Sequence, residues 1–515
     1  MSHPKLNKFL QTLIGESTDL GKITLSDAVD QVPNSRLGEH HLLDTSPETR
    51  LRHARGQSLP DWLAMRSGDI GAFPDAVAKP RTVSEVRELL DLASKQNFDV
   101  IPYGGGTSVV GHINPVSDEN AVLTIDMGMM NQILHVDSES QLVTIGAGAT
   151  GPQIEQSLKE LGFVLGHYPQ SWEYSTLGGW VATRSSGQQS LQYGRIEQLF
   201  GGANVETLAG NLKIPALPAS AAGLDMREII LGSEGRMGII TDVTVRVSSS
   251  PETEYFGALY LSSWEEGLAF VRNLIQQRIP LSMLRLSNPL ETAAHIAMNG
   301  EHRPSASVRL GAVMVTYGIS GAKVQCSAIL DRLLGLGRNF KAEEADGAIT
   351  DWTKSRFKAP YLRDLLGDLG YAADTMETAV NWSNVEETTK RIEKAICNAL
   401  ANEDEKVLAY SHLSHMYPQG SSIYTTYLFR MGNSYNDALL RWAKIKKAGA
   451  REIVACGGTI SHQHGVGTDH KDFLTDEKGV LGIAAMDRLC NLFDPNGQMN
   501  PKKLLPDDVK KNGKP

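Results

Sequence analysis

The sequence predicts an α+β protein with two lobes, and three observations support this prediction. From Pro74 to Val245, short apolar strands alternate with amphipathic helices and glycine turns, a pattern typical of α+β or α/β domains. Past Pro251 the composition becomes more helical, which predicts a second domain. A chain of 515 residues, 41% of them hydrophobic, is long enough for more than one core.

The first lobe begins with a helix after Pro80, where Ser84 can act as the N-cap. Its apolar residues fall on one face, and they are Val86, Leu89, Leu90 and Ala93. A strand over Asp99 to Pro102 then leads into a glycine loop. Short strands rich in branched residues are expected after the loop, at 121–125, 133–136 and 142–145.

A second helix has Pro152 in its first turn, and Gly162 is expected to end it. Its inward residues are expected to be Ile154, Leu158 and Leu161. Residues 208–224 are rich in Pro, Ala and Gly, and we expect them to form a surface loop without helix or strand. Further helices are expected in the second lobe at 264–276, 323–334 and 385–401.

Charge and composition exclude several classes of function. The formal net charge is −9, from 50 basic and 59 acidic residues, without a dense basic run, so we expect no nucleic-acid partner. The four cysteines show no C-x-x-C spacing and are interpreted as isolated buried thiols. No signal-peptide pattern and no apolar run of roughly 18 residues is found, so we expect a cytoplasmic protein without a transmembrane segment.

The glycine loop, Pro102 to Gly111, is the strongest chemical signal. Three consecutive glycines leave backbone amides uncovered, so that they can approach an anion such as a diphosphate. A Rossmann loop requires a third glycine where Val109 stands, and a Walker A loop requires a Gly-Lys-Ser/Thr that does not follow. An anion cradle between two strands remains, and a tight glycine turn without a ligand is the alternative.

These residues resemble FAD enzymes of the vanillyl-alcohol oxidase type, which have a PCMH-type FAD domain of two subdomains. The resemblance rests on the loop and on segments 169–187, 232–240, 461–467 and 494–501, and within this type it is strongest to the alkyldihydroxyacetonephosphate synthases. It implies an N-terminal helical extension at 1–70, an FAD domain at 71–250, a cap or substrate domain at 251–455 and a closing segment at 456–515. The cap is expected to contain an antiparallel sheet with flanking helices. The resemblance also implies a homodimer.

The resemblance further implies which residues bind FAD. They are Pro102, Tyr103, Gly104, Gly105, Gly106, Thr107, Ser108, Gly111, Pro169, Gln170, Ser171, Ser175, Thr176, Gly178, Gly179, Thr183, Arg184, Ser185, Ser186, Glu234, Gly235, Gly238, Ile239, Ile240 and Asn500. Covalent members of the family carry a histidine in or beside the loop. Here Thr107 stands in its place and His112 lies beyond the loop, so we predict non-covalent FAD.

Two catalytic candidates lie in the second lobe. Arg285 stands in an apolar stretch, where it requires a partner: a bound phosphate or carboxylate, or an internal salt bridge. Tyr424 lies in a strand-like run in which it and Ile423 face opposite sides, and a buried core phenol is the alternative. In the family, the arginine contacts the substrate phosphate and the tyrosine assists proton transfer.

The other two candidates are His462 and His464, which share one face if their segment is extended. Imidazoles suit transition metals, but we expect no metal site here. The synthases carry three consecutive histidines at this place, and Gln463 replaces the middle one, which removes a titratable base. His415 can supply a third imidazole.

The resemblance implies exchange of the acyl group of acyl-dihydroxyacetone phosphate for a long-chain alcohol, through a bond to flavin N5, as in ether-lipid biosynthesis. The alternatives are an FAD-dependent dehydrogenase or oxidase of a D-2-hydroxy acid, and a flavin-binding scaffold without turnover. The expected partner is a small or lipid-like molecule with a phosphate or carboxylate, presented in solution or at a membrane surface.

Overall fold

The computed structural model describes residues 3–116, 120–298, 311–345 and 362–507. The chain forms two compact units. The loop unit contains residues 21–187, 194–249 and 463–515, and the cap unit contains residues 1–20, 188–193 and 250–462. The predicted four-part division, with boundaries at 70, 250 and 455, stays a prediction.

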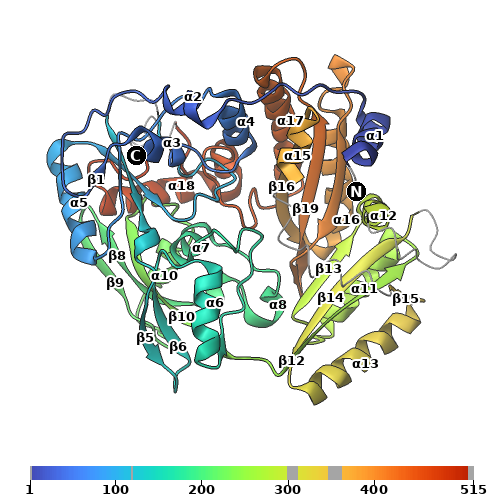
Figure 1. Cartoon of the computed structure of the whole chain (residues 1–515). Helices are drawn as coiled ribbons and strands as arrows, with labels where there is room; N and C mark the ends of the chain where they lie inside the picture. Colours follow the sequence, from blue (N-terminus) through green and yellow to red (C-terminus); the bar gives the residue numbers. More distant parts are fainter. Residues whose placement is uncertain (1–2, 117–119, 299–310, 346–361, 508–515) are drawn as a thin grey trace. The chain divides into compact units, whose positions relative to one another are not determined.

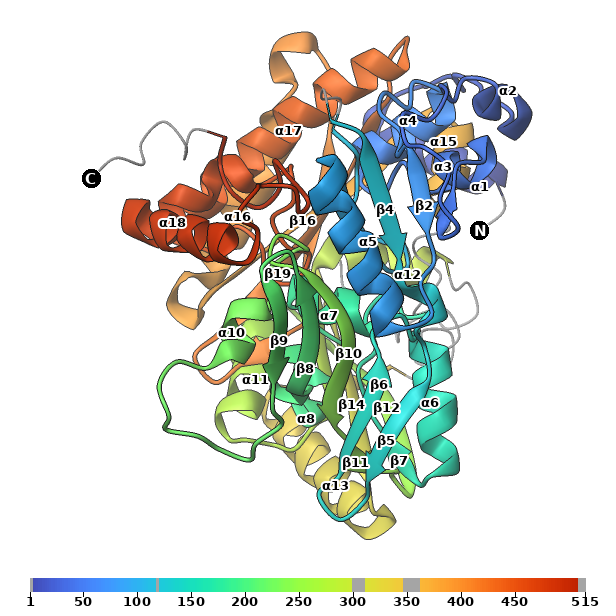
Figure 2. The same cartoon turned by 90° about the vertical axis from the view of Figure 1, so that its left-hand side faces the viewer.

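The first sheet of the loop unit has the order β1-β2-β4-β3, with parallel pairing among its last three strands. Its strands are β1 (Leu43–Asp44), β2 (Ala76–Ala78), β3 (Asp99–Tyr103) and β4 (Val122–Asp126). Helix α5 (Val83–Gln96) lies against this sheet and buries its apolar face there (Figure 2). The chain returns near its end, since Val100 exchanges backbone hydrogen bonds with Gln498 and Asn500.

The second sheet of the loop unit is antiparallel and has the order β5-β6-β10-β8-β9. Its strands are β5 (Ile133–Asp137), β6 (Leu142–Gly146), β8 (Phe200–Thr207), β9 (Gly210–Ile214) and β10 (Ile239–Arg246). The remaining elements include α4 (Leu59–Ser67), α6 (Gly151–Glu160), α7 (Leu177–Thr183), α10 (Met226–Ile230) and α18 (Leu474–Phe493). Two short strands, β7 (Phe163–Val164) and β11 (Ser248–Ser249), pair with each other.

Three local expectations for this unit are wrong. Thr82, not Ser84, caps α5, because its side chain accepts the amide of Glu85 and the helix begins at Val83. Leu161 is 46% exposed, since α6 ends at Glu160 and the chain turns there. Residues 208–224 do contain a strand, β9, because a two-residue turn after β8 returns the chain along the same sheet.

The cap unit is built on one antiparallel sheet of eight strands, ordered β15-β12-β14-β13-β17-β19-β16 with β18 beside β19 (Figure 1). Its strands are β12 (Thr253–Leu261), β13 (Met283–Ser287), β14 (Val313–Gly321), β15 (Glu343–Glu344), β16 (Tyr371–Asn381), β17 (Leu408–Leu413), β18 (Met416–Tyr417) and β19 (Gly420–Arg430). The predicted α+β class, with an antiparallel sheet in the second lobe, is confirmed.

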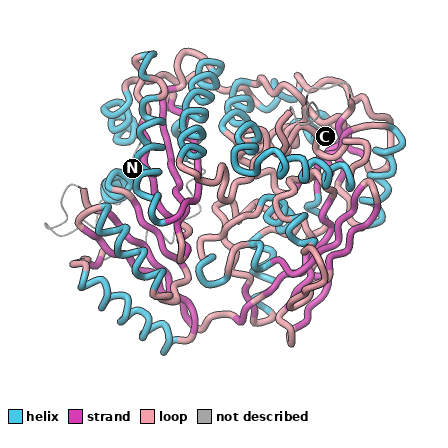
Figure 3. The backbone as a smooth tube through the Cα atoms, turned by 180° about the vertical axis from the view of Figure 1, so that it is seen from behind, coloured by secondary structure: helices cyan, strands magenta, loops and turns pink. Residues whose placement is uncertain are grey.

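Helices lie along both faces of this sheet, cyan against the magenta strands in Figure 3. They are α1 (His3–Ile14), α11 (Trp264–Gln276), α12 (Pro289–Met298), α13 (Lys323–Asn339), α15 (Leu362–Asp368), α16 (Trp382–Asn398) and α17 (Tyr435–Ala455). Helix α11 has the predicted bounds, α13 continues past the predicted end, and α16 begins and ends three residues before the predicted bounds. No helix in the described ranges is long and apolar enough to cross a membrane.

The two faces of the cap sheet differ in chemistry because side chains alternate along each strand. One face is apolar, with Leu284, Leu286, Leu413 and Ile423 in a core covered by α11, α13 and α16. The opposite face carries a row of directly paired residues. This polar row is Ser287, His412, Tyr424 and Glu377, from strands β13, β17, β19 and β16.

Candidate functional site

The glycine loop lies between the parallel strands β3 and β4, and its described residues 104–116 hold no helix. Gly104 and Gly105 are packed too closely against segment 174–176 to carry side chains. A Cβ atom on Gly104 would lie 2.3 Å from the Thr176 Oγ1 atom, and one on Gly105 would lie 1.8 Å from the Tyr174 carbonyl oxygen. Gly106 has φ +68°, which favours glycine. The loop therefore holds its backbone against segment 174–176.

The buried polar atoms of the loop unit that have no hydrogen-bond partner within the described part of the chain include three from predicted cofactor residues. They are the Thr176 hydroxyl, the Ser186 hydroxyl and the Asn500 Oδ1 atom. Thr176 stands at the N-cap of α7 but makes no side-chain cap bond. Buried polar atoms are normally satisfied, so these unpaired atoms, with the Thr176 hydroxyl directly beside Gly104, indicate a polar ligand. These residues fit a bound dinucleotide.

Glu234 connects this loop to the returning C-terminal segment. Its two carboxylate oxygens accept the amides of Val466 at 2.6 Å and Gly467 at 2.8 Å. Its backbone carbonyl accepts the Asn500 side-chain amide at 2.7 Å, and its Oε2 lies 3.2 Å from the His112 Nε2 atom. Glu234 was predicted to bind the cofactor, and in the structure its carboxylate holds protein groups together. We call these contacts the Glu234 clasp.

Replacement of Glu234 by alanine is expected to destabilise the loop unit by roughly 3–5 kcal/mol, because two buried amides would lose a charged acceptor. Urea denaturation followed by circular dichroism measures this change. Glu160→Ala, at the exposed end of α6, is the control and should change stability little. A loss below about 1 kcal/mol for Glu234→Ala would contradict the clasp.

Other predicted cofactor residues are engaged elsewhere. Arg184 donates to the Glu228 carboxylate at 2.7 Å and to the Leu231 carbonyl at 3.2 Å. The Ile239 side chain belongs to the core under the first sheet. The hydroxyls of Ser175 and Thr183 donate to the Ser171 and Gly179 carbonyl oxygens of their own turns. These residues can contact a ligand through their backbone groups, or through side-chain atoms that these contacts leave unused.

His112 lies just past the loop, between Ser108 and Glu234. Its Nδ1 pairs with the Ser108 hydroxyl at 2.8 Å, and its Nε2 faces the Glu234 carboxylate. Its ring is buried, at 5% exposure. The histidine nearest to the loop in sequence is therefore part of the loop's support.

In the cap unit, Arg285 lies beside the polar row and is ion-paired. Its Nη2 atom is 2.5 Å from the Glu291 Oε1 atom on α12 and 3.1 Å from the His412 Nδ1 atom. Although burial alone would raise the pKa of Glu291, the positive charge of Arg285 outweighs it and holds this pKa well below its usual range. Burial, reinforced by Arg285, lowers the pKa of His412. The cluster therefore contains one cation, one anion and a neutral ring.

Tyr424 stands next in the row, stacked on His412 with ring centroids 4.9 Å apart. Its hydroxyl donates to the Thr375 hydroxyl at 3.2 Å. As predicted, Ile423 faces the apolar core and Tyr424 the opposite side. Burial raises the pKa of Tyr424 to about 12, so its phenol keeps the proton at neutral pH.

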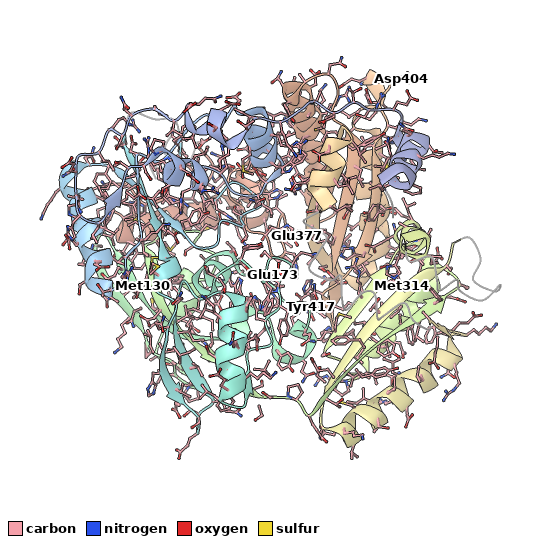
Figure 4. All side chains as sticks on the ribbon, viewed as in Figure 1. Met130, Glu173, Met314, Glu377, Asp404 and Tyr417 are labelled. Carbon is pink, nitrogen blue, oxygen red and sulfur yellow. The ribbon has the colours of Figure 1, made fainter. Side chains whose placement is uncertain are left out.

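A second cluster surrounds His462 at one end of the row. Its Nε2 pairs with the Tyr417 hydroxyl at 2.6 Å, its Nδ1 lies 3.9 Å from the Glu377 carboxylate, and its ring is 5.1 Å from that of His415. Figure 4 labels Glu377 and Tyr417. The chain bends at 462–464 and is not extended, so strand alternation does not put His462 and His464 on one face. His462 belongs to the cap unit and His464 to the loop unit.

Sequence reasoning missed Glu291, His412, Tyr417 and Glu377. No alternation singled out His412, because Tyr410, Ser411 and His412 are three consecutive polar residues in β17. Among the described residues, one group of three meets the distances of a metal site: His40, His41 and Glu88. The Nδ1 atom of His40 accepts the Leu42 amide, which puts its proton on the Nε2 that faces Glu88. The Nε2 atoms of His40 and His41 lie 3.3 Å and 3.6 Å from the same Glu88 oxygen.

Known proteins resemble the chain over most of its length. Residues 250–504 match the family of FAD linked oxidases, C-terminal domain, and residues 74–213 match the FAD binding domain family. Alkyldihydroxyacetonephosphate synthase of Dictyostelium discoideum is 32% identical, over 90% of this chain and 79% of that protein. The enzyme of Caenorhabditis elegans is 31% identical, over 96% and 87%.

A solved structure of alkyldihydroxyacetonephosphate synthase matches with a TM-score of 0.83 at 26% identity, over 98% of this chain and 93% of that one. The two family matches confirm the predicted cofactor, FAD. The unpaired polar atoms beside the glycine loop agree with a cofactor in the loop unit.

Proposed function

This chain belongs to the alkyldihydroxyacetonephosphate synthase family, and from that premise we propose that it exchanges the acyl group of acyl-dihydroxyacetone phosphate for a long-chain alcohol. The products are the alkyl ether of dihydroxyacetone phosphate and a free fatty acid. The observation that carries the proposal is the polar face of the cap sheet, where Arg285 stands beside Ser287, His412, Tyr424 and Glu377.

Arg285 is the proposed phosphate anchor. Guanidinium groups bind phosphate through two or three parallel hydrogen bonds, which fix orientation as well as position. The Nη1 atom of Arg285 makes no hydrogen bond within the described ranges, and the side chain is 26% exposed. An anchor of this kind orients the substrate carbon for reaction.

FAD is proposed to be held without a covalent bond by residues 104–111, Thr176, Ser186 and Asn500. Thr107 offers no nucleophilic ring, and the buried His112 ring is held between Ser108 and Glu234. When bound, FAD supplies an electrophilic ring system that can accept electron density from the substrate carbon.

Proton handling is assigned to the other polar residues. The protonated phenol of Tyr424 is a hydrogen-bond donor at neutral pH. His462 is held between Tyr417 and Glu377, which suits a group that passes a proton without reorienting. His464 stays a candidate for the same task in the loop unit.

Replacement of Tyr424 by phenylalanine is expected to lower kcat by roughly 100-fold, because a proton donor is removed from the polar face of the cap sheet. FAD content should not change. Since Tyr424 stays protonated over the working range, the variant should keep the shape of the wild-type pH profile. Loss of an alkaline limb in the variant would show that Tyr424 titrates and contradict this role.

The function is tested with purified holoenzyme, acyl-dihydroxyacetone phosphate and radiolabelled hexadecanol, while flavin absorbance is recorded. Appearance of labelled alkyl product without lasting flavin bleaching supports the proposal. Bleaching by D-2-hydroxy acids without alkyl transfer would identify an oxidising enzyme instead. No response to either substrate would favour a flavin-binding scaffold.

The proposal extends to the setting of the reaction. From the family premise we propose a role in ether-lipid synthesis and a cytoplasmic location. We also propose a homodimer, and contact with a membrane surface that presents the long alcohol.

A further inference from the structure

The proposed phosphate anchor already has an anionic partner. Arg285 Nη2 lies 2.5 Å from the Glu291 Oε1 atom, and the Glu291 side chain is only 18% exposed. The same oxygen lies 3.3 Å from His412 Nδ1. Any anion that binds Arg285 must therefore compete with Glu291 or bind against its charge.

Glu291 is fixed in place by the start of α12. Its backbone amide donates a hydrogen bond to the Asn288 side-chain oxygen at 2.9 Å. The next residue, Thr292, bonds to the Ser287 carbonyl and to the Met314 amide, which ties α12 to strands β13 and β14. The carboxylate is thus part of the sheet's polar face and not a mobile surface group.

We propose that Glu291 is the built-in counter-ion of an anion site at Arg285, and that it sets the charge an incoming group must carry. The inference rests on the proposed function, because it assigns the substrate phosphate to Arg285. A phosphate dianion binds this site, and a carboxylate monoanion gains too little to bind appreciably.

The charges of the competing anions explain why a dianion binds and a monoanion does not; we call this requirement the charge threshold. A carboxylate ligand that takes Arg285 from Glu291 exchanges one single negative charge for another, so the net gain is small. A phosphate monoester carries about −1.5 to −2 charges near neutral pH and has three acceptor oxygens, so it retains a net gain after the exchange.

His412 makes the exchange feasible. Its Nδ1 can accept from Arg285 or donate to Glu291, depending on the tautomer. When a ligand takes the guanidinium, the neutral ring can donate to the carboxylate, so Glu291 is not left without a partner. The site thereby rejects 2-hydroxy acids, whose only charge is one carboxylate, and accepts a phosphate ester.

The test compares wild-type holoenzyme with Glu291→Gln, which keeps the side-chain oxygen but removes its charge. Binding of glycerol 3-phosphate and of glycerate, which share a three-carbon skeleton, is measured by calorimetry at pH 8. Glu265→Gln, at the exposed start of α11, is the control with the same charge change. Glu291→Met is the second variant, and FAD content and circular dichroism establish that each variant is folded.

Wild type is expected to bind glycerol 3-phosphate and to give no measurable binding of glycerate. In Glu291→Gln, the Kd for glycerol 3-phosphate should fall on the order of tenfold, and glycerate binding should become measurable. Glu265→Gln should behave as wild type.

Other outcomes overturn the inference in distinguishable ways. Unchanged or weaker binding of both ligands by folded Glu291 variants would mean that Glu291 only supports Arg285. Equal binding of both ligands by wild type would remove the charge threshold and leave the phosphate anchor intact. Binding of neither ligand by wild type would contradict the anchor itself, and with it the proposed function.

Discussion

Replacement of Arg285 by alanine is expected to lower turnover by roughly 100- to 1,000-fold while the protein keeps its FAD. The reason is the loss of the anchor that orients the substrate phosphate on the polar face. The measurement is kcat and KM for acyl exchange, together with the ratio of flavin to protein absorbance. Normal FAD content is expected because the glycine loop belongs to the other compact unit.

A second effect of this change has to be separated from the first. Without Arg285, the buried Glu291 carboxylate loses its cation, which destabilises the cap unit. The double variant Arg285→Ala, Glu291→Gln removes both charges and should recover stability without recovering turnover. If the double variant regains activity, the unpaired carboxylate caused the loss and Arg285 is not the anchor.

Replacement of Gly105 by alanine is expected to yield protein that does not retain FAD. A Cβ atom at this position would lie 1.8 Å from the Tyr174 carbonyl oxygen, so the loop must withdraw from segment 174–176. The unpaired Thr176 hydroxyl lies in that segment, and its distance from the loop would change with it. Flavin absorbance of the purified protein measures the loss.

Gly38→Ala is the matched control, because a Cβ atom there meets no heavy atom within 4 Å. Circular dichroism should show that both variants are folded. A Gly105→Ala protein with one FAD per chain would remove the basis for the cradle. The larger Gly105→Asp should lose FAD as well, and it adds a negative charge beside the site.

The features that could be predicted from sequence depend on short stretches of chain. The glycine loop needs only consecutive residues, and α11 was predicted with its observed bounds from its apolar period alone. The structure shows that Ser263 caps this helix at the predicted start. Where two local signals compete, the prediction failed. Thr82 and Ser84 are both capping residues, and the side chain that reaches Glu85 is decided by where the helix begins.

The arrangement around Arg285 could not be predicted, because it depends on register. Ser287, His412 and Tyr424 become neighbours only when three strands pair in one alignment, and they are separated by up to 137 residues in the chain. A shift of one residue would turn His412 toward the apolar core. The sequence left two alternatives open for Arg285, a bound ligand or an internal salt bridge. The structure shows the salt bridge, to Glu291, and a ligand at Arg285 would have to compete with it.

The Glu234 clasp has a consequence for the order of events in the cell. It joins Glu234, which comes before residues 250–462 of the cap unit in the sequence, to Val466, Gly467 and Asn500, which come after them. The edge of the first sheet at Val100 is likewise completed by Gln498 and Asn500. During synthesis the loop unit therefore lacks these contacts until residues 250–462 of the cap unit have been made.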